Sequence, residues 1–515
     1  MKQKEQAPQN ETSIRKPNLL FILTDQERAL MHFPPGWEAQ HLTAMPRLRE
    51  HGISFTNAFC NTCMCSPSRA TWLTGQYPAE HGVILTLTEN MTYSDVEPTL
   101  LPQTQNMARM LSAGGYNVTY IGKWHLSKDA NGSFENLTTE DLEQYGFMGW
   151  VPPDAGEDTA PEHFGAGEAN NDLNYINQAL NFLYTVQRGE QAQPFALFLS
   201  LVNPHDVLAF PKTWQDNFDI SYLKGDIQLP PTINENLHET LKPTVQQMLR
   251  PYLDLALDPL PDDRHKLEYL NFYGNLIAHI DAQINTVLDV LNQEYDTNKK
   301  LSLAENTIVV RISDHGEMGL THGALRQKMF NMYEETISVP MVISNPIFFP
   351  RAEVSSQLIS LVDLMPTING LLNLDNPLQY IFRGADLSPV IKSPRTAPEI
   401  QDAILFTFDD FRAGNANAIN PLPAANRIRG IREKRWKYAY YFYVAPPEQV
   451  PAKSYPVEYE MYDLENDPHE TNNLANKDNP DYNHPFIVAQ RERLHKKLLA
   501  LEKEKLGSIR DTVTA

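Results

Sequence analysis

Five apolar runs are the feature that most restricts the fold of this 515-residue chain. Each is a short, nearly continuous stretch of apolar residues that ends in polar or turn-forming residues. Runs of this kind are typical of strands that are buried on both faces of a parallel sheet. The predicted strands are Asn18–Thr24, Val118–Gly122, Phe195–Val202, Thr307–Ile312 and Val339–Ser344.

Helical patterns lie between these runs. Residues 43–52 and 102–114 each combine an early proline with a final glycine, which predicts a short helix. An apolar face that repeats with helical spacing over residues 277–291 predicts a longer one. The repeated order of strand, helix and strand predicts an α/β fold, in which helices cover both faces of a large, mostly parallel sheet.

A different pattern begins near residue 395. Short antiparallel strands are predicted at Ala403–Phe408, Arg427–Arg432 and Trp436–Tyr443. A long terminal helix is predicted at His484–Lys505. We therefore predict a disordered polar tail over residues 1–16, an α/β domain that carries the candidate site over 17–395, and a smaller α+β domain with an antiparallel sheet over 396–515.

The formal net charge of −21 at pH 7 argues against nucleic acid and against an anionic membrane surface as partners. No stretch approaches the roughly eighteen apolar residues of a membrane span. The N-terminal residues also lack the apolar core of a signal peptide. We therefore expect a cytoplasmic protein with no membrane association, and the composition leaves homo-oligomer formation open.

The stretch CSPSRATWLTG, from Cys65 to Gly75, predicts a reactive site. Pro67 suits the first turn of a helix and Gly75 suits its end. Cys65 should then lie at the N-terminus of this helix, where backbone N–H groups and the helix dipole favour negative charge. Arg69 lies one turn further along the same face. The stretch therefore fits an anion site with a potential nucleophile, and a buried structural cysteine is the alternative.

Polar side chains follow the ends of four predicted strands, where open parallel sheets bind their ligands. Four of these side chains offer two carboxylates, an amide oxygen and an imidazole, which can together hold one divalent cation: Asp25, Gln26, Asp314 and His315. Either aspartate alone could instead be a helix cap or a turn former. The combination is what predicts a metal site.

Taken together, these motifs resemble those of the sulfatase family, and the resemblance covers most of the chain. The stretch that begins at Cys65 is similar to the activating motif C-x-P-x-R, whose cysteine is oxidised after translation to Cα-formylglycine. The further matching segments are T-D-Q at 24–26, G-K-W-H at 122–125, N-P-H at 203–205, S-D-H-G at 313–316 and the following Lys328. The resemblance implies an alkaline phosphatase-like fold and a sulfuric ester hydrolase of the arylsulfatase type.

The resemblance also implies a metal site. One divalent cation would be held by Asp25, Gln26, Asp314, His315 and the modified Cys65. Many sulfatases have a second aspartate in place of Gln26 and an asparagine in place of His315. Oxygen ligands suit Ca²⁺, whereas the imidazole moves the preference toward Mn²⁺. We favour Ca²⁺, with Mn²⁺ as the alternative.

Sulfate ester hydrolysis is the activity that the resemblance implies. Arg69 and Lys123 would hold the formylglycine hydrate, one hydroxyl of which attacks sulfur. His205, together with Lys328, would protonate the leaving alcohol. His125 would then take a proton from the second hydroxyl as sulfate leaves. The implied partners are a small sulfate ester as substrate and a formylglycine-generating enzyme for maturation.

Two other functions fit parts of the pattern. A phosphonate monoester hydrolase or phosphodiesterase of the same superfamily shares the fold and the formylglycine, but Lys123 and His125 favour sulfate. A noncatalytic sulfate-ester binding protein would need an incomplete set of site residues. Every expected position is occupied in this sequence.

An acidic stretch follows His125 directly. Residues 129–187 contain eleven Asp and Glu and no Lys or Arg, and their composition predicts mostly loop. One interpretation is a solvated surface insertion. The other is an acidic wall at the substrate entrance, formed by residues such as Glu157, Asp158 and Glu162, that disfavours polyanionic substrates.

Overall fold

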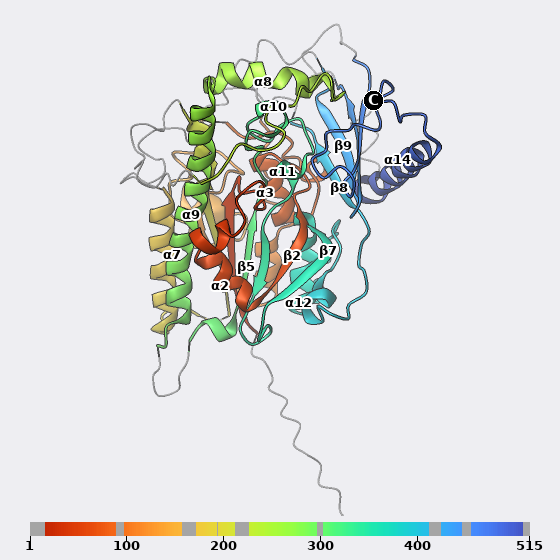
Figure 1. Cartoon of the computed structure of the whole chain (residues 1–515). Coiled ribbons are helices and arrows are strands. Elements are labelled where there is room, and N and C mark those ends of the chain that lie inside the picture. The colour runs from red at the N-terminus through yellow and green to blue at the C-terminus, as the bar shows by residue number, and fades with distance from the viewer. Residues whose placement is uncertain are drawn as a thin grey trace, which may run out of the picture.

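A seven-stranded sheet lies at the centre of the computed structural model (Figure 1). The structure describes residues 16–88, 97–156, 171–192, 194–211, 226–295, 302–410, 424–444 and 455–507. The strand order is β3-β4-β1-β5-β6-β2-β7. The strands are β1 (Asn18–Asp25), β2 (Gly52–Phe59), β3 (Asn117–Gly122), β4 (Phe195–Pro204), β5 (Thr307–Ser313), β6 (Met341–Ser344) and β7 (Glu353–Ser360). Strand β6 is antiparallel to both neighbours and the other pairs are parallel, which confirms a mostly parallel sheet.

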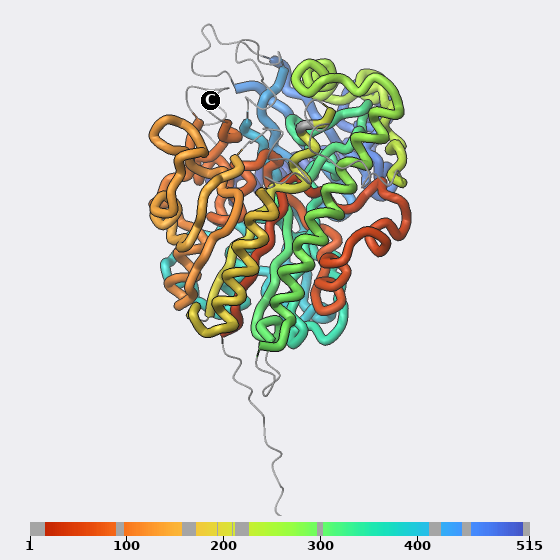
Figure 2. Tube along the Cα trace, turned by 90° about the vertical axis from the view of Figure 1, so that its left-hand side faces the viewer, coloured from red at the N-terminus to blue at the C-terminus, as the bar shows by residue number. Residues whose placement is uncertain are grey.

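Helices cover both faces of this sheet, as the sequence predicts. On one face, α7 (Asn171–Gln187) and α9 (Asp263–Asn292) lie side by side (Figure 2). The other face packs against α3 (Cys65–Thr74), α5 (Met107–Ala113) and α12 (Leu364–Leu371). Successive side chains of a strand point to opposite faces, so Leu20 and Ile22 of β1 join one core while Leu19, Phe21 and Leu23 join the other. This double burial explains the continuous apolar run of β1.

A second, four-stranded antiparallel sheet follows in the C-terminal part. Its strands are β8 (Ile404–Phe408), β9 (Arg427–Arg432), β10 (Trp436–Phe442) and β11 (Glu458–Asp463). The terminal helix α14 (Pro485–Leu506) packs Leu494 and Leu498 against Leu405 and Ile431 of this sheet. The predicted antiparallel sheet and terminal helix are confirmed, and the boundary near residue 395 stays a prediction.

Several elements differ from the sequence-based expectations. Strands β2 and β7 and helix α8 (Thr244–Leu257) were not predicted. Helix α7 contradicts the expectation of loop over its part of residues 129–187, because its apolar residues recur with helical spacing and are buried. No helix within the described ranges combines the length and the apolar character that a membrane span requires.

The register of the strands brings four polar segments to one edge of the sheet. Thr24 of β1 pairs with Ser313 of β5, so Asp25 and Asp314 follow at the same level. On the other side of β1, Asp25 pairs with Pro204, and His205 comes next. Strand β3 ends beside β4 at Gly122, whose φ is 104° and whose hypothetical Cβ would lie 1.9 Å from the Ser200 carbonyl oxygen. Only glycine fits there, immediately before Lys123.

Candidate active site

Cys65 begins helix α3, as its sequence predicts. The helix runs to Thr74, and Gly75 ends it in the left-handed conformation, with φ at 66°. The Cys65 side chain is fully buried. Burial, with the neighbouring Asp25 carboxylate, raises the pKa of the Cys65 thiol well above its usual value. The unmodified residue is therefore a protonated thiol and a poor nucleophile.

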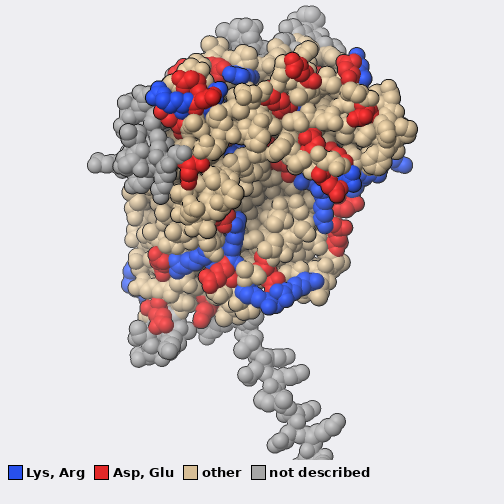
Figure 3. Space-filling model, viewed as in Figure 1, with Lys and Arg blue, Asp and Glu red and all other residues tan. Residues whose placement is uncertain are grey.

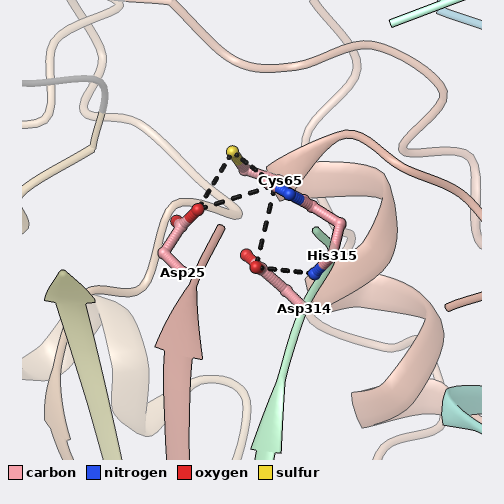
Figure 4. Close-up of side chains that lie close together, drawn as sticks. All are labelled: Asp25, Cys65, Asp314 and His315. Carbon is pink, nitrogen blue, oxygen red and sulfur yellow. Dashed lines mark hydrogen bonds and ion pairs between the residues drawn. The ribbon is translucent and has the colours of Figure 1, made fainter. Parts of the chain in front are cut away.

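Four buried side chains converge at the ends of β1 and β5 and the start of α3 (Figure 4). Their potential ligand atoms all lie within 4.8 Å of one another: Asp25, Cys65, Asp314 and His315. The Cys65 sulfur is 3.5 Å from Asp25 Oδ1 and 3.2 Å from His315 Nε2. Burial and the Lys328 ammonium lower the pKa of His315 to about 3, so its imidazole is neutral and can donate a lone pair. Two carboxylates and a neutral imidazole are a donor set that fits one divalent cation.

Gln26 lies at the border of this cluster. Its backbone has a positive φ of 66°, and its N–H donates to Asp314 Oδ1 at 3.1 Å. The side-chain oxygen accepts a hydrogen bond of 2.6 Å from Lys328 Nζ, and the side-chain nitrogen donates to Glu317 Oε2 at 2.5 Å. The structure therefore brings Gln26 and Lys328, two predicted site residues, into direct contact.

Two buried cations balance the two aspartates. Arg69 lies 2.9 Å from Asp25 Oδ2 and 3.2 Å from Asp314 Oδ2, and Lys123 Nζ lies 2.7 Å from Asp25 Oδ2. Burial by itself would raise the pKa of Asp25, but Lys123 and the other positive groups hold it well below its usual range. For Asp314, burial and the Asp25 carboxylate raise the pKa. The site thus holds Asp25 as a carboxylate between two cations.

The two predicted catalytic histidines are buried beside this group. His125 has a φ of 57°, and its Nε2 donates to the Leu87 carbonyl oxygen at 2.7 Å. Burial and Lys123 lower the pKa of His125 well below its usual value. A neutral ring that donates through Nε2 carries its lone pair on Nδ1, which has no hydrogen-bond partner among the described residues. Burial and Lys123 likewise lower the pKa of His205, and its Nε2 has no described hydrogen-bond partner.

Sequence reasoning missed two buried carboxylates that hold the loops of the predicted catalytic histidines. Asp154 accepts hydrogen bonds from the backbone N–H of Trp124 at 2.8 Å, through Oδ1, and of His125 at 2.9 Å, through Oδ2. Asp172 accepts from the N–H groups of Val202 and Asn203, just before His205. Neither contact can be recognised from neighbouring residues in the sequence, because each joins residues about 30 positions apart. The turn-forming residues around Asp154 could have indicated a loop there.

These two aspartates change the interpretation of the acidic stretch. Both belong to residues 129–187, yet both are buried and accept hydrogen bonds from the site loops. Glu157, Asp158 and Glu162, the proposed wall, lie outside the described residues. On the face shown in Figure 3, acidic and basic side chains are interspersed. The acidic wall stays a prediction for those residues.

Comparison with known proteins assigns the family. The family model for sulfatases matches residues 17–374, and the model for the C-terminal part of N-sulphoglucosamine sulphohydrolase matches residues 321–504. The chain belongs to the sulfatase family. It is a sulfuric ester hydrolase with the mixed sheet and the C-terminal antiparallel sheet described above.

A curated relative agrees with this assignment, and solved structures share the fold. An ulvan-active sulfatase of Formosa agariphila is 28% identical over 504 residues, covering 95% of this chain and 82% of the relative. A solved 2-O GAG sulfatase has a TM-score of 0.68 at 20% identity and covers 95% of this sulfatase and 93% of its own chain. A phosphonate monoester hydrolase from Silicibacter pomeroyi gives the same TM-score at 20% identity, with 96% of each chain covered.

Replacing Asp154 tests whether its carboxylate holds the His125 loop in place. Asp154 Oδ1 accepts from the N–H groups of Trp124 and Gly156, and Oδ2 accepts from that of His125. Asp154→Asn leaves one oxygen on the side chain, so at least one N–H of the His125 loop loses its acceptor. An unsatisfied buried group costs about 1–3 kcal/mol, and we expect the free energy of unfolding to fall by about that amount. We also expect kcat for a sulfate ester to fall at least about tenfold with little change in KM, because a 1.4 kcal/mol effect on the transition state is tenfold in rate.

Glu135→Gln is the matched control, since Glu135 is an exposed acid of the same stretch. Urea denaturation and steady-state kinetics are measured on both variants. Wild-type kcat and stability in Asp154→Asn would remove Asp154 from this role.

Proposed function

We propose that this sulfatase hydrolyses a small sulfate ester to an alcohol and inorganic sulfate, using Cα-formylglycine formed from Cys65 and one divalent cation. The observation that carries the proposal is the position of the Cys65 sulfur, 3.5 Å from Asp25 Oδ1 in a buried cluster with Asp314 and His315. The thiol itself is a poor nucleophile there, which is consistent with a need for modification. A formylglycine-generating enzyme is the proposed maturation partner.

The proposed cation ligands are Asp25, Gln26, Asp314, His315 and the modified residue 65. The buried carboxylates and the neutral imidazole fit a divalent cation, and the predominance of oxygen donors favours Ca²⁺ over Mn²⁺. A cation held by these groups would act as a Lewis acid toward the sulfate oxygens and favour ionisation of the attacking hydroxyl. Lys328 would add further positive charge around the same oxygens.

The proposed nucleophile side of the site consists of Arg69, Lys123 and His125. Formylglycine hydrate would supply two hydroxyls on one carbon, one to attack sulfur and one whose deprotonation expels sulfate. Arg69 and Lys123, both fixed on Asp25, would hold these hydroxyls. His125 would accept the proton at Nδ1, because its Nε2 is committed to the Leu87 carbonyl.

The proposed leaving-group side consists of His205 and Lys328. His205 is neutral at rest, since burial and Lys123 lower its pKa. A bound sulfate ester brings negative charge next to the ring, which favours the imidazolium and opposes that effect. His205 would then donate its proton to the departing alcohol oxygen, with Lys328 stabilising the developing charge.

A phosphonate monoester hydrolase is the second candidate function. The observation in its favour is the structural likeness to the Silicibacter pomeroyi enzyme, which equals the likeness to the 2-O GAG sulfatase. Lys123 and His125 support sulfate instead, since the resemblance associates G-K-W-H with sulfatases. Rate measurements separate the two candidates.

The first prediction concerns the group transferred. With fully modified protein, we expect kcat/KM for an aryl sulfate to exceed that for the matched aryl phosphonate monoester and aryl phosphate diester. The three substrates all carry a single negative charge, so the expectation rests on Lys123 and His125, which the resemblance associates with sulfatases. Cys65→Ala should abolish turnover of all three while thermal unfolding remains cooperative. A phosphonate or diester rate above the sulfate rate would favour the second candidate.

The second prediction concerns maturation of Cys65. After co-expression with a formylglycine-generating enzyme, peptide mass spectrometry should find the aldehyde or its hydrate at position 65. Cys60 and Cys63 lie on the same proteolytic fragment and are also buried, so they serve as internal controls that should remain thiols. Active enzyme that carries only unmodified Cys65 would refute the proposal.

The third prediction concerns the general acid. A proton donor contributes about 10²–10⁴-fold where the leaving group needs it. His205→Ala should therefore reduce kcat/KM strongly for alkyl sulfates and little for aryl sulfates with acidic phenols. The exposed His238→Ala is the control and should change neither. An equal loss across the leaving-group series would exclude His205 as the acid.

A further inference from the structure

Glu317 is a buried carboxylate at the border of the site that the proposed reaction does not use. It follows β5 in the turn after His315, and its exposed fraction is 0%. Its Oε1 accepts from the Tyr269 hydroxyl at 2.6 Å and from the N–H of Gln327 at 2.9 Å and of Gly319 at 3.2 Å. Its Oε2 accepts from Gln26 Nε2 at 2.5 Å. Four donors therefore converge on one side chain, which acts only as an acceptor.

The contact with Gln26 fixes the direction of an amide that could otherwise turn over. A glutamine amide has an oxygen that accepts and a nitrogen that donates, and rotation by half a turn exchanges them. Here the nitrogen faces Glu317, a pure acceptor, and the oxygen faces the Lys328 ammonium, a pure donor, at 2.6 Å. The turned amide would place oxygen against carboxylate and nitrogen against ammonium. Both contacts would be lost at once.

We propose that Glu317 is a positioning residue that holds the oxygen of Gln26 toward the cation site and toward Lys328. The inference rests on the proposed function, because it assigns Gln26 as a cation ligand. A carbonyl oxygen has two lone pairs, so one can accept from Lys328 while the other faces the cation. An aspartate in place of Gln26 would have two equivalent oxygens and would need no such orientation. Glu317 thus makes glutamine usable as a ligand at this position.

Glu317 also supplies negative charge. Without it, the buried charged groups of the site are two aspartates against three cations: Asp25, Asp314, Arg69, Lys123 and Lys328. Glu317 adds a third carboxylate, which contacts the side chain of the proposed ligand Gln26. Through the Gln327 N–H it also fixes the backbone next to Lys328. One carboxylate therefore sets both the amide of Gln26 and the position of the lysine that bonds to it.

The test exchanges the two partners. In Glu317→Gln, the backbone N–H groups of Gly319 and Gln327 hold the new amide oxygen, so the amide nitrogen faces Gln26. The Gln26 amide can then keep its oxygen on Lys328 only against a donor-to-donor contact with residue 317. Gln26→Glu/Glu317→Gln restores a carboxylate and an amide that can pair, with the same number of side-chain atoms. Tyr269→Phe is the matched control, because it removes one donor to Glu317 without touching Gln26. The readout is the Kd for Ca²⁺ alone and for Mn²⁺ alone, by isothermal titration of metal-depleted protein.

We expect Glu317→Gln to weaken cation binding at least about tenfold, which corresponds to about 1.4 kcal/mol. The double variant should bind at least as tightly as wild type, because a carboxylate at position 26 needs no orientation, and Tyr269→Phe should stay close to wild type. Wild-type affinity in Glu317→Gln, or a double variant no tighter than Glu317→Gln, would overturn the inference. If Glu317→Gln does not fold, Glu317→Asp, whose shorter side chain withdraws the carboxylate from Gln26, is measured instead, and wild-type affinity in that variant would overturn the inference. Absence of cation binding by the wild-type protein would instead overturn the proposed function.

Discussion

Two aspartates buried side by side at the ends of neighbouring strands are the constraint on which the site depends. Asp25 and Asp314 follow paired residues of β1 and β5, so the sheet itself brings their charges together. Desolvating two carboxylates in one place costs several kcal/mol per charge unless cations compensate. Arg69 from α3 and Lys123 from the end of β3 provide this compensation. Helix α3 is thereby tied to the sheet edge, and Cys65 is fixed beside Asp25.

Some of the chain's many acidic residues have a structural role around these two aspartates. Three further buried carboxylates accept backbone N–H bonds from loops that carry proposed catalytic residues. Asp154 holds the His125 loop, Asp172 holds the residues before His205, and Glu317 holds the residue before Lys328. Both Gln26 and His125 have a positive φ, a conformation that non-glycine residues rarely adopt without support. The loops around the site are therefore held by specific acceptors rather than by packing alone.

The sequence predicted the parts of the fold that depend on local pattern. Strand β1 shows its double burial as a continuous apolar run, and the cysteine motif shows both the start and the end of α3. The parts that it could not predict depend on distant pairing. Strand β2 mixes polar with apolar residues and is inserted between β6 and β7, and the contact between Gln26 and Glu317 joins residues 291 positions apart. No periodicity records such a contact, although the motifs located both partners' loops.

The C-terminal sheet contacts segments on two sides of the site. Lys437 of β10 donates to the Met332 carbonyl oxygen at 2.6 Å, and Arg432 of β9 pairs with Glu334 at 2.8 Å. Phe330 packs against Phe408 of β8, with ring centroids 4.9 Å apart. These contacts hold the segment that follows Lys328. The same sheet also holds the segment before Cys65, because the Asn61 side chain donates to the Leu405 carbonyl oxygen at 3.1 Å and the Thr407 N–H donates to the Asn61 carbonyl oxygen at 2.8 Å. In the proposed function, the smaller sheet thus supports both the side that receives the alcohol and the side that carries the nucleophile.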